Sequence, residues 1–360
     1  MIEANKQNLE KKISKYFDRK YCLLTGNGTT SMYLFFATLK KKSIILFPAI
    51  TCMQAVNAAI FAGHKILYTD VSINSFAMEY ENFLEVVKNK KIDVVVPTHI
   101  FGHVVELSKI INYCNKNNIL VLEDATQSMG GKIENKKVGS FGDASVMSFG
   151  YSKIIDCGGG GCILTDHLDL YKKIKKQEFL IPKKPVNYIN KINQYKKFYY
   201  INKKKLKKNI FCEKLFLHQK KKKNLFIYKI DLTTINKILK KIETIRSILK
   251  IRKENYNLYK YNLSKKKIII PKLSKHSVSW RFNFLLKNKR NELVEFLRKI
   301  NIDVSTWYPS LHYYPKQMSD LYRNSKKIEK NIVNLWTDEY QSTDKVKKNI
   351  SIINSYFKNK

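Results

Sequence analysis

Short apolar runs alternate with longer amphipathic stretches between residues 20 and 175. The apolar runs have the length and composition of strands, and they lie at 43–47, 64–70, 92–99, 119–124, 143–149 and 161–166. Apolar residues recur at helical spacing in the intervening segments 29–40, 51–62, 79–90 and 104–117. Because a helix between two strands serves as a crossover, this pattern predicts an α/β fold with a mostly parallel central sheet covered on both faces.

The pattern changes after residue 180. Residues 181–228 combine lysine runs, interleaved aromatic residues and two prolines, which indicates a basic, aromatic insertion or linker. Helical spacing then continues without interruption over 232–263 and predicts one long helix. We therefore predict a large α/β domain over 1–180, the divergent segment 181–228, and a smaller C-terminal α+β domain over 229–360.

The net charge of the chain changes this picture little. A formal charge of +39 normally suggests nucleic acid or an anionic membrane as partner. Only seven of the 68 basic residues are arginine, however, and the lysines accompany many isoleucines and asparagines, as AT-rich coding would produce. Since arginine binds phosphates and bases better than lysine does, we predict no specific nucleic-acid partner.

The cysteines and the N-terminus indicate a cytoplasmic protein. The six cysteines form no CxxC pair and no Cys/His cluster, so we predict reduced thiols and no metal site. The N-terminal segment is a polar amphipathic helix that lacks the apolar core of a signal peptide. No segment approaches the ~18 apolar residues of a membrane span.

The first loop with candidate chemistry reads TGNGTTS. Gly28 permits a tight turn, and Thr29 and Thr30 begin a helix whose free N–H groups and positive dipole end suit a phosphate. A glycine turn followed by a threonine cap, without any ligand, explains the same residues.

The second loop follows the apolar run 119–124. Asp124 ends that run, and Gln127 follows about one helical turn later. A buried carboxylate needs a cationic partner or several hydrogen-bond donors, and a cationic heterocycle would be such a partner. A plain N-cap aspartate is the alternative.

The third loop, MSFGYSKIIDCGGGG, holds Lys153 between an apolar run and four glycines. Ser148 lies where the run ends. A lysine with the ordinary pKa of about 10.4 is a poor nucleophile at neutral pH. Partial burial and a nearby cation lower the pKa and yield a free amine that can bond to an aldehyde. The alternative is one more surface lysine.

A single ligand would satisfy all three loops. It would carry a phosphate, a protonated ring nitrogen and an aldehyde, and pyridoxal 5′-phosphate is such a molecule. The helix start and Ser148 would hold the phosphate, Asp124 would keep the ring nitrogen protonated, and Lys153 would bond to the aldehyde and later act as general acid and base.

At this point the sequence resembles the DegT-type sugar aminotransferases, pyridoxal-phosphate enzymes of aminotransferase fold type I. The resemblance runs from about residue 20 to the C-terminus and is weakest over 180–228. It rests on motifs in the family's order: NGTTSM, FPAITC, VNAAIFAGHKILYTDV, VPTHIFG, VLEDATQSMGG, VGSFGDASVMSFGYSK, GGGG and WYPSLH.

The resemblance implies roles for individual residues. Lys153 would be the lysine that bonds to the cofactor, Asp124 the partner of the ring nitrogen, and Gln127 a contact to the phenolic oxygen. Gly28, Thr29, Thr30 and Ser148 would surround the phosphate. Family members move an amino group, typically from glutamate, to a keto group of a nucleotide-activated sugar in glycan biosynthesis, and they act as homodimers. Members that carry out dehydration have histidine at the lysine position, so Lys153 favours transamination.

Three departures from the family pattern leave other functions open. Cys52 follows Thr51 where the family has a ring-stacking aromatic, residues 158–161 lack the glutamate of a GEGG motif, and the family's N-x-R segment has no clear match. A catalytically impaired regulatory or binding protein is therefore one alternative. Another is a family member that acts on a different keto substrate at a membrane surface, bound through residues 185–228.

Overall fold

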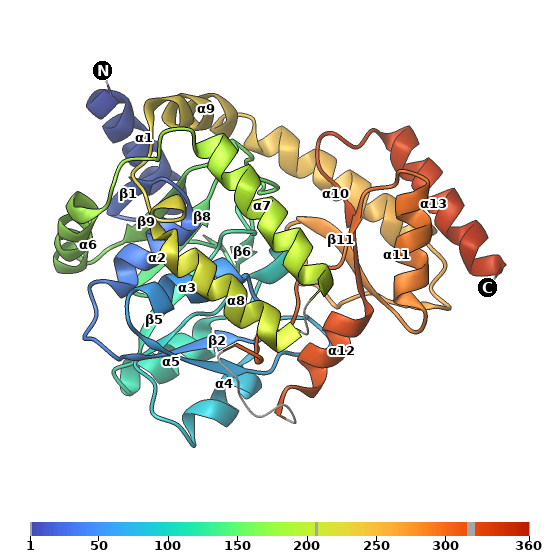
Figure 1. The fold of residues 1–360 in the computed structure, drawn as a ribbon, viewed down its shortest axis with the longest axis horizontal. Helices are drawn as coiled ribbons and strands as arrows, with labels where there is room; N and C mark the ends of the chain where they lie inside the picture. Colours follow the sequence, from blue (N-terminus) through green and yellow to red (C-terminus); the bar gives the residue numbers. More distant parts are fainter. Residues whose placement is uncertain (1, 206–207, 315–320, 360) are drawn as a thin grey trace.

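The computed structural model describes residues 2–205, 208–314 and 321–359. Figure 1 shows a larger part built around one sheet and, beyond helix α10, a smaller part with its own sheet. The candidate site residues lie at the C-terminal ends of strands of the larger sheet, or on a turn or helix start next to those ends.

The larger sheet has seven strands in the order β1-β9-β8-β5-β4-β2-β3. The pairs from β8 to β3 are parallel, and β9 is antiparallel to both of its neighbours. The predicted α/β fold with a mostly parallel central sheet is therefore confirmed. The strands are β1 (Tyr21–Thr25), β2 (Ile44–Pro48), β3 (Lys65–Thr69), β4 (Val94–Val95), β5 (Leu120–Asp124), β8 (Ala144–Ser148) and β9 (Gly161–Thr165).

Both faces of this sheet are buried, as predicted. Successive residues of a strand point to opposite faces, and in β5 Val121 joins one apolar cluster while Leu122 joins the other. The covering helices are α1 (Ile2–Phe17), α2 (Gly28–Phe36), α3 (Met53–Phe61), α4 (Tyr80–Val87), α5 (Ser108–Lys116) and α6 (Leu168–Leu180). The loop regions between them also contain the 3-10 turn η1 (Ile100–Gly102) and the small hairpin of β6 (Lys132–Ile133) and β7 (Lys136–Lys137).

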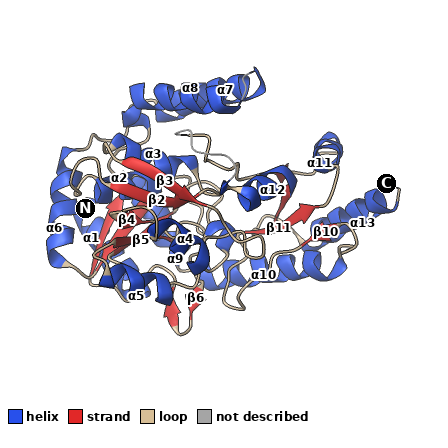
Figure 2. Ribbon diagram, turned by 90° about the horizontal axis from the view of Figure 1, so that it is seen from below, coloured by secondary structure: helices blue, strands red, loops and turns tan. Residues whose placement is uncertain are grey.

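The divergent segment 181–228 forms two helices, α7 (Tyr188–Lys205) and α8 (Lys208–Lys221), followed by the turn η2 (Lys223–Leu225). Figure 2 shows the pair standing on the outer side of α3. The ring of Phe216 stacks on that of Phe61 in α3 at 5.9 Å between centroids. The segment therefore packs on the larger sheet's helical layer through its aromatic residues.

The predicted long helix after residue 230 is wrong, because the structure has two helices there. Helix α9 (Leu232–Ile242) and helix α10 (Ile245–Asn262) are separated at Glu243 and Thr244. The Thr244 hydroxyl donates to the Lys241 carbonyl at 2.8 Å, which satisfies one of the free carbonyls at the end of α9.

The smaller sheet is antiparallel, with the order β10-β11-β13-β12. Its strands are β10 (Ile268–Ile269), β11 (Arg281–Leu286), β12 (Val304–Ser305) and β13 (Ile332–Trp336), and its helices are α11 (Arg290–Lys299), α12 (Arg323–Asn331) and α13 (Thr343–Lys358). Phe282 and Phe284 belong to a separate apolar cluster on one face of this sheet. The division into domains at 180 and 228 stays a prediction. Among the described residues, no helix is both long enough and apolar enough to cross a membrane.

Candidate active site

Lys153 lies on the turn that joins β8 to β9. The turn is tied together by its own backbone, because Phe149 N–H donates to Gly160 O at 2.9 Å and Cys157 N–H donates to Phe149 O at 2.8 Å. Gly160 has a φ of +90°, a conformation that glycine adopts without strain. These contacts fix the position of the lysine backbone.

The Lys153 amine is half-buried and points to the end of β5. Its Nζ lies 3.4 Å from Thr126 Oγ1. Burial lowers the pKa of this amine, because a charged amine loses solvation there. Cys52 and Asp124 oppose the shift, and the positive charge of Arg281 adds to it. The environment therefore shifts the amine towards its neutral form, and the role of Lys153 as the cofactor-bonding lysine stays a prediction.

Asp124 is buried at the end of β5, with 2% of its surface exposed. Its Oδ1 accepts from the Thr126 N–H at 3.1 Å. Burial raises the pKa of this carboxyl, and the charge of Lys153 is the largest opposing influence. Among the described residues no cation lies within ion-pair distance of Asp124. A cationic group bound beside it would therefore stabilise its charged form.

Gln127 connects the end of β5 to the smaller part of the molecule. Its Oε1 accepts from the Phe101 N–H at 2.8 Å, and its Nε2 donates to the Tyr308 hydroxyl at 2.8 Å. Tyr308, from the WYPSLH motif, is a site residue that the sequence reasoning did not single out. Its ring lies 5.8 Å from that of Phe101.

The start of α2 lies against the ends of β5 and β8. Gly28 is packed so closely there that an added Cβ would lie 3.1 Å from Ser148 Cβ and 3.5 Å from Thr126 Cγ2. Thr29, in the first turn of α2, is half-buried. The helix start, Ser148 and the threonine beside Lys153 are thus brought together, and their contact with a phosphate stays a prediction.

Thr30 is placed differently from Thr29. Its buried hydroxyl lies 3.2 Å from both Asn27 Oδ1 and Phe226 O and accepts from the Tyr228 N–H. Its backbone N–H donates to Asn27 Oδ1 at 2.8 Å. The side chain of Thr30 therefore holds the 226–228 segment against α2, and its predicted phosphate contact stays a prediction.

Cys52, which stands where the family has an aromatic residue, is close enough to Lys153 and Asp124 for their charges to affect its thiol. Burial raises the pKa of that thiol, and the charge of Lys153 partly offsets the effect. His312, from the WYPSLH motif, is fully buried and stacks on Tyr322 with ring centroids 4.9 Å apart, so it is a packed core side chain.

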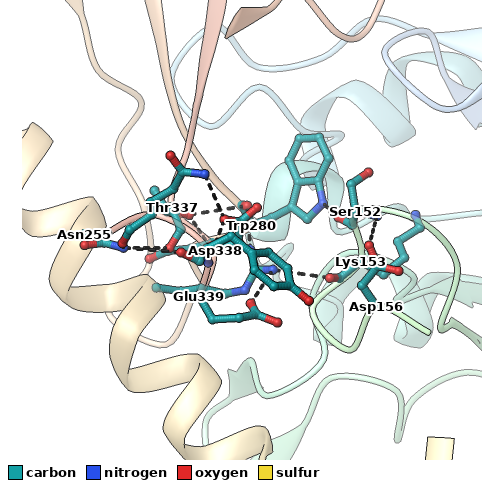
Figure 3. A network of polar contacts seen from close by, with 12 residues as sticks. Ser152, Lys153, Asp156, Asn255, Trp280, Thr337, Asp338 and Glu339 are labelled. Carbon is teal, nitrogen blue, oxygen red and sulfur yellow. Dashed lines mark hydrogen bonds and ion pairs between the residues drawn. The ribbon is translucent and has the colours of Figure 1, made fainter. Parts of the chain in front are cut away.

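The smaller sheet holds the lysine turn from the other side. Figure 3 shows Trp280, at the start of β11, directed at Ser152, to whose carbonyl its Nε1–H donates at 2.6 Å. Arg252 donates to the carbonyls of Lys153 at 3.3 Å and Trp280 at 3.0 Å. Glu339 lies 3.5 Å from Arg252 and completes the network. The backbone of Lys153, and not its amine, takes part in these bonds.

The described side chains fit pyridoxal phosphate in three respects. They provide an amine with a lowered pKa, a buried carboxylate without an ion-pair partner, and a glycine-lined helix start beside a serine. An aldehyde, a protonated ring nitrogen and a phosphate would meet these groups in turn.

Comparison with solved structures gives the class of the fold. PseC of Helicobacter pylori, an aminotransferase involved in the biosynthesis of pseudoaminic acid, superimposes with a TM-score of 0.80 over 99% of this chain and 91% of its own, at 16% identity. GDP-4-keto-6-deoxy-D-mannose-3-dehydratase of E. coli, solved with bound hydrated pyridoxal phosphate, gives 0.76 over 97% and 91%, at 18% identity. The chain has the fold of the pyridoxal-phosphate sugar aminotransferases, as the sequence predicts.

The chain belongs to the DegT/DnrJ/EryC1/StrS aminotransferase family, whose sequence model matches residues 3–354. The resemblance given by its motifs is therefore confirmed. Among curated relatives, GDP-perosamine synthase of Caulobacter vibrioides is 28% identical over 168 residues, which is 46% of this chain and 45% of that protein. The alignment thus spans a little under half the length of this relative.

Proposed function

We propose that this protein is a pyridoxal-phosphate-dependent aminotransferase that moves an amino group, from glutamate, to a keto group of a nucleotide-activated sugar in glycan biosynthesis. The observation that carries the proposal is the Lys153 amine, with its lowered pKa, beside the buried Asp124 carboxylate and the start of α2. Family membership and the similarity to GDP-perosamine synthase support the choice of sugar.

When bound, the cofactor supplies an aldehyde and a ring that accepts electrons. Lys153 Nζ, whose pKa is lowered by burial, would bond to the aldehyde. When the donor's amine takes its place, the same nitrogen would act as general base at the donor's α-carbon and as general acid towards the cofactor, and in the opposite sense with the acceptor in the second half-reaction.

Asp124 and Gln127 orient the cofactor and hold its charge. The Asp124 carboxylate would balance the charge of the ring nitrogen and, since it is buried, would gain more from that positive charge than it would in water. Gln127 is held by its hydrogen bonds to Phe101 and Tyr308, so its amide would contact the phenolic oxygen from a fixed position. Ser148 and the first turn of α2 would bind the phosphate.

The test uses the purified protein reconstituted with pyridoxal phosphate. We expect a visible absorbance band from the lysine-bound cofactor, loss of that band on adding glutamate, and transfer of ¹⁵N from labelled glutamate to one member of a panel of nucleotide keto-sugars. A band that no amino donor changes would contradict the proposal and favour the regulatory alternative.

Two further parts of the proposal concern partners and location. We infer a homodimer in the cytoplasm, with the nucleotide sugar and the amino-acid donor as small-molecule partners and no specific nucleic-acid partner. Analytical ultracentrifugation of the reconstituted protein tests the dimer, and a single species with the mass of one chain would contradict it.

The alternative in which the enzyme acts at a membrane surface depends on residues 185–228. Val186, Ile189, Tyr200 and Leu217, all within residues 185–228, are exposed, and lysines accompany them. Such a surface can bind anionic lipid. Sedimentation with neutral and anionic liposomes at low salt distinguishes a segment that binds the membrane from one that is only solvated. A solvated segment is recovered equally with both kinds of liposome.

A further inference from the structure

A cleft lies where the larger part of the molecule meets α10 and the loop 271–279. Its volume is about 550 Å³, which is within the range of small-molecule sites. Residues of α10 form one wall, and the start of β6 and the loop 271–279 form the others. None of the candidate site residues lines this cleft. Figure 2 shows α10 and β6 on the side of the molecule opposite to α7 and α8.

The α10 wall is one face of the helix. Leu249, Lys253, Tyr256 and Lys260 all line the cleft, and they follow one another at intervals of three or four residues. Side chains at this spacing lie on the same side of a helix. Arg252 lies outside this row and bonds to the Lys153 carbonyl instead. The helix thus uses different faces for the cleft and for the lysine turn.

Tyr256 lines the cleft with a side chain that is largely buried. It exposes 7% of its surface, and its ring packs against that of Phe282 with centroids 5.2 Å apart. None of the described residues forms a hydrogen bond with its hydroxyl, and burial raises the pKa of that group to about 12. A buried polar group without a partner is costly. Since the hydroxyl keeps its proton at neutral pH, it is a donor that a ligand in the cleft can satisfy.

The cleft contains basic side chains and, among the described residues, no carboxylate. The basic residues that line it are Lys132, Lys253, Lys260, Lys275 and His276. In the part of the chain that the structure describes, no carboxylate lies within ion-pair distance of these four lysines. Like charges around one cavity repel one another, and an anion between them removes this repulsion. The cleft therefore favours an anionic ligand.

The remaining wall suits an organic group. Leu249, Leu273 and Val278 contribute apolar side chains, on which an apolar or aromatic group can pack. The Asn257 amide, which forms no side-chain hydrogen bond with the described residues, lies on the same helix face as Tyr256 and adds further donors. A bare ion would leave the apolar part of this wall uncovered.

We propose that this cleft binds a small organic phosphate. A phosphate has several oxygens that accept hydrogen bonds from different directions, and the Tyr256 hydroxyl and the lysines provide donors on more than one wall. The organic part of the ligand packs on Leu249 and Leu273. Lysines alone do not define the site, because they cover much of the surface of this chain. The buried hydroxyl and the apolar wall distinguish it.

A ligand in this cleft contacts both parts of the molecule. Lys132 belongs to the larger part, whereas Lys253 belongs to α10, which leads into the smaller part. A phosphate between their charges holds the two parts together. The inference does not depend on amino transfer, because no candidate active-site residue contributes to the cleft.

The first experiment measures phenyl phosphate binding by calorimetry. The protein is reconstituted with pyridoxal phosphate, so that the phosphate site proposed at α2 is already filled. We expect saturable binding, with an affinity about tenfold or more lower in Tyr256→Phe, which removes the hydroxyl and keeps the ring that packs on Phe282. Inorganic phosphate should bind about tenfold or more weakly than phenyl phosphate, since it lacks the apolar group.

The second experiment removes charge from the α10 wall. Lys253→Gln combined with Lys260→Gln should weaken phenyl phosphate binding about tenfold or more and reduce its dependence on salt. The matched control is Lys237→Gln combined with Lys240→Gln, which removes the same charge from exposed positions of α9. The control should bind phenyl phosphate normally.

Several results would overturn the inference. These are an unchanged affinity in Tyr256→Phe, an equal affinity for inorganic phosphate, and an equal loss of binding in the α9 control, which would show a general attraction by the net charge. If Tyr256→Phe does not fold, the comparison of the α10 lysine pair with the α9 lysine pair decides by the same criterion.

Discussion

The turn at Lys153 and the helical pair α7–α8 use the same side chain in opposite ways. Lys153 is half-buried on a turn held by β8, β9 and the smaller sheet, and burial lowers its pKa. Lys196 of α7 is instead exposed and lies over the ring of Tyr151 at 5.4 Å. Helix α7 also contacts the Lys153 turn, through Lys196 and Tyr151. The two lysines are therefore distinguished by how far water is excluded from the amine, and not by their position in the fold alone.

The comparison also explains why the large net charge says little about function. Most lysines resemble those of α7, with their stems on apolar surface and their charge in water. A reactive lysine needs the loss of water, a nearby cation and a fixed backbone together. Within the described residues, Lys153 has all three.

The largest effect is expected when Lys153 itself is replaced. Lys153→Ala should abolish covalent attachment of pyridoxal phosphate, since the bonding nitrogen is gone. Borohydride reduction followed by peptide mass spectrometry measures the attachment. Lys196→Ala is the control, because it removes a lysine close to the same turn and should leave attachment intact. Attachment that survives in Lys153→Ala would show that another amine is used.

Asp124→Asn should have the next largest effect. The variant keeps the shape of the side chain and removes the buried charge that stabilises a cationic ring. We expect weaker cofactor binding and a half-reaction with glutamate slower by about 100-fold or more, which stopped-flow absorbance measures. A half-reaction near the native rate would remove Asp124 from its assigned role.

Arg281→Gln tests whether a nearby positive charge helps to lower the pKa of Lys153. The positive charge of Arg281 helps to lower the pKa of Lys153, so its removal should raise that pKa. Attachment of the cofactor requires the neutral amine, and its pH profile should therefore move to higher pH. The rate of attachment to apoprotein across a pH series measures the shift, and Arg246→Gln should show none. A shift to lower pH would contradict the sign.

The smallest effect is expected at the surface lysines of the helical pair. Replacing Lys220, Lys221 and Lys222 together by glutamine should change the free energy of unfolding by no more than about 0.5 kcal/mol per residue. Attachment of the cofactor should stay at the native level. Chemical denaturation and borohydride trapping measure the two quantities, and a loss of attachment would mean that the pair acts on the site.

The strands were largely predictable because each is a compact apolar run. The runs at 43–47, 119–124 and 143–149 differ from the observed β2, β5 and β8 by one residue at most at each end. The run at 92–99 was too long, since β4 covers only Val94–Val95. Pro97 cannot donate to a neighbouring strand, and this limits the ladder there.

The spacing of apolar residues does not predict the interruption between α9 and α10. Ile238, Ile242 and Ile245 continue one apolar stripe across it, and nothing in their spacing marks Glu243 and Thr244. The cause is tertiary, because Ile238 packs on Gly160 at the larger sheet while Tyr259 belongs to the core of the smaller one. The chain must leave one core and enter the other.

The candidate residues that the structure brings together end or follow a strand of the larger sheet, as Asp124, Ser148 and Lys153 do. Sequence reasoning missed Tyr308, which bonds to Gln127, and Arg281, whose charge affects Lys153, because both lie in the C-terminal part of the chain, more than a hundred residues later in the sequence. A signal for Arg281 did exist. An arginine between Trp280 and Phe282, in a chain that otherwise uses lysine, is unusual.

The bonds from Trp280 and Arg252 to the carbonyls of Ser152 and Lys153 have a mechanical consequence. They tie the backbone of Lys153 to the smaller, C-terminal part of the molecule, so a shift of that part moves the lysine with it. A substitution deep in the C-terminal core, for instance at Phe282, should therefore alter chemistry at a residue that it never touches.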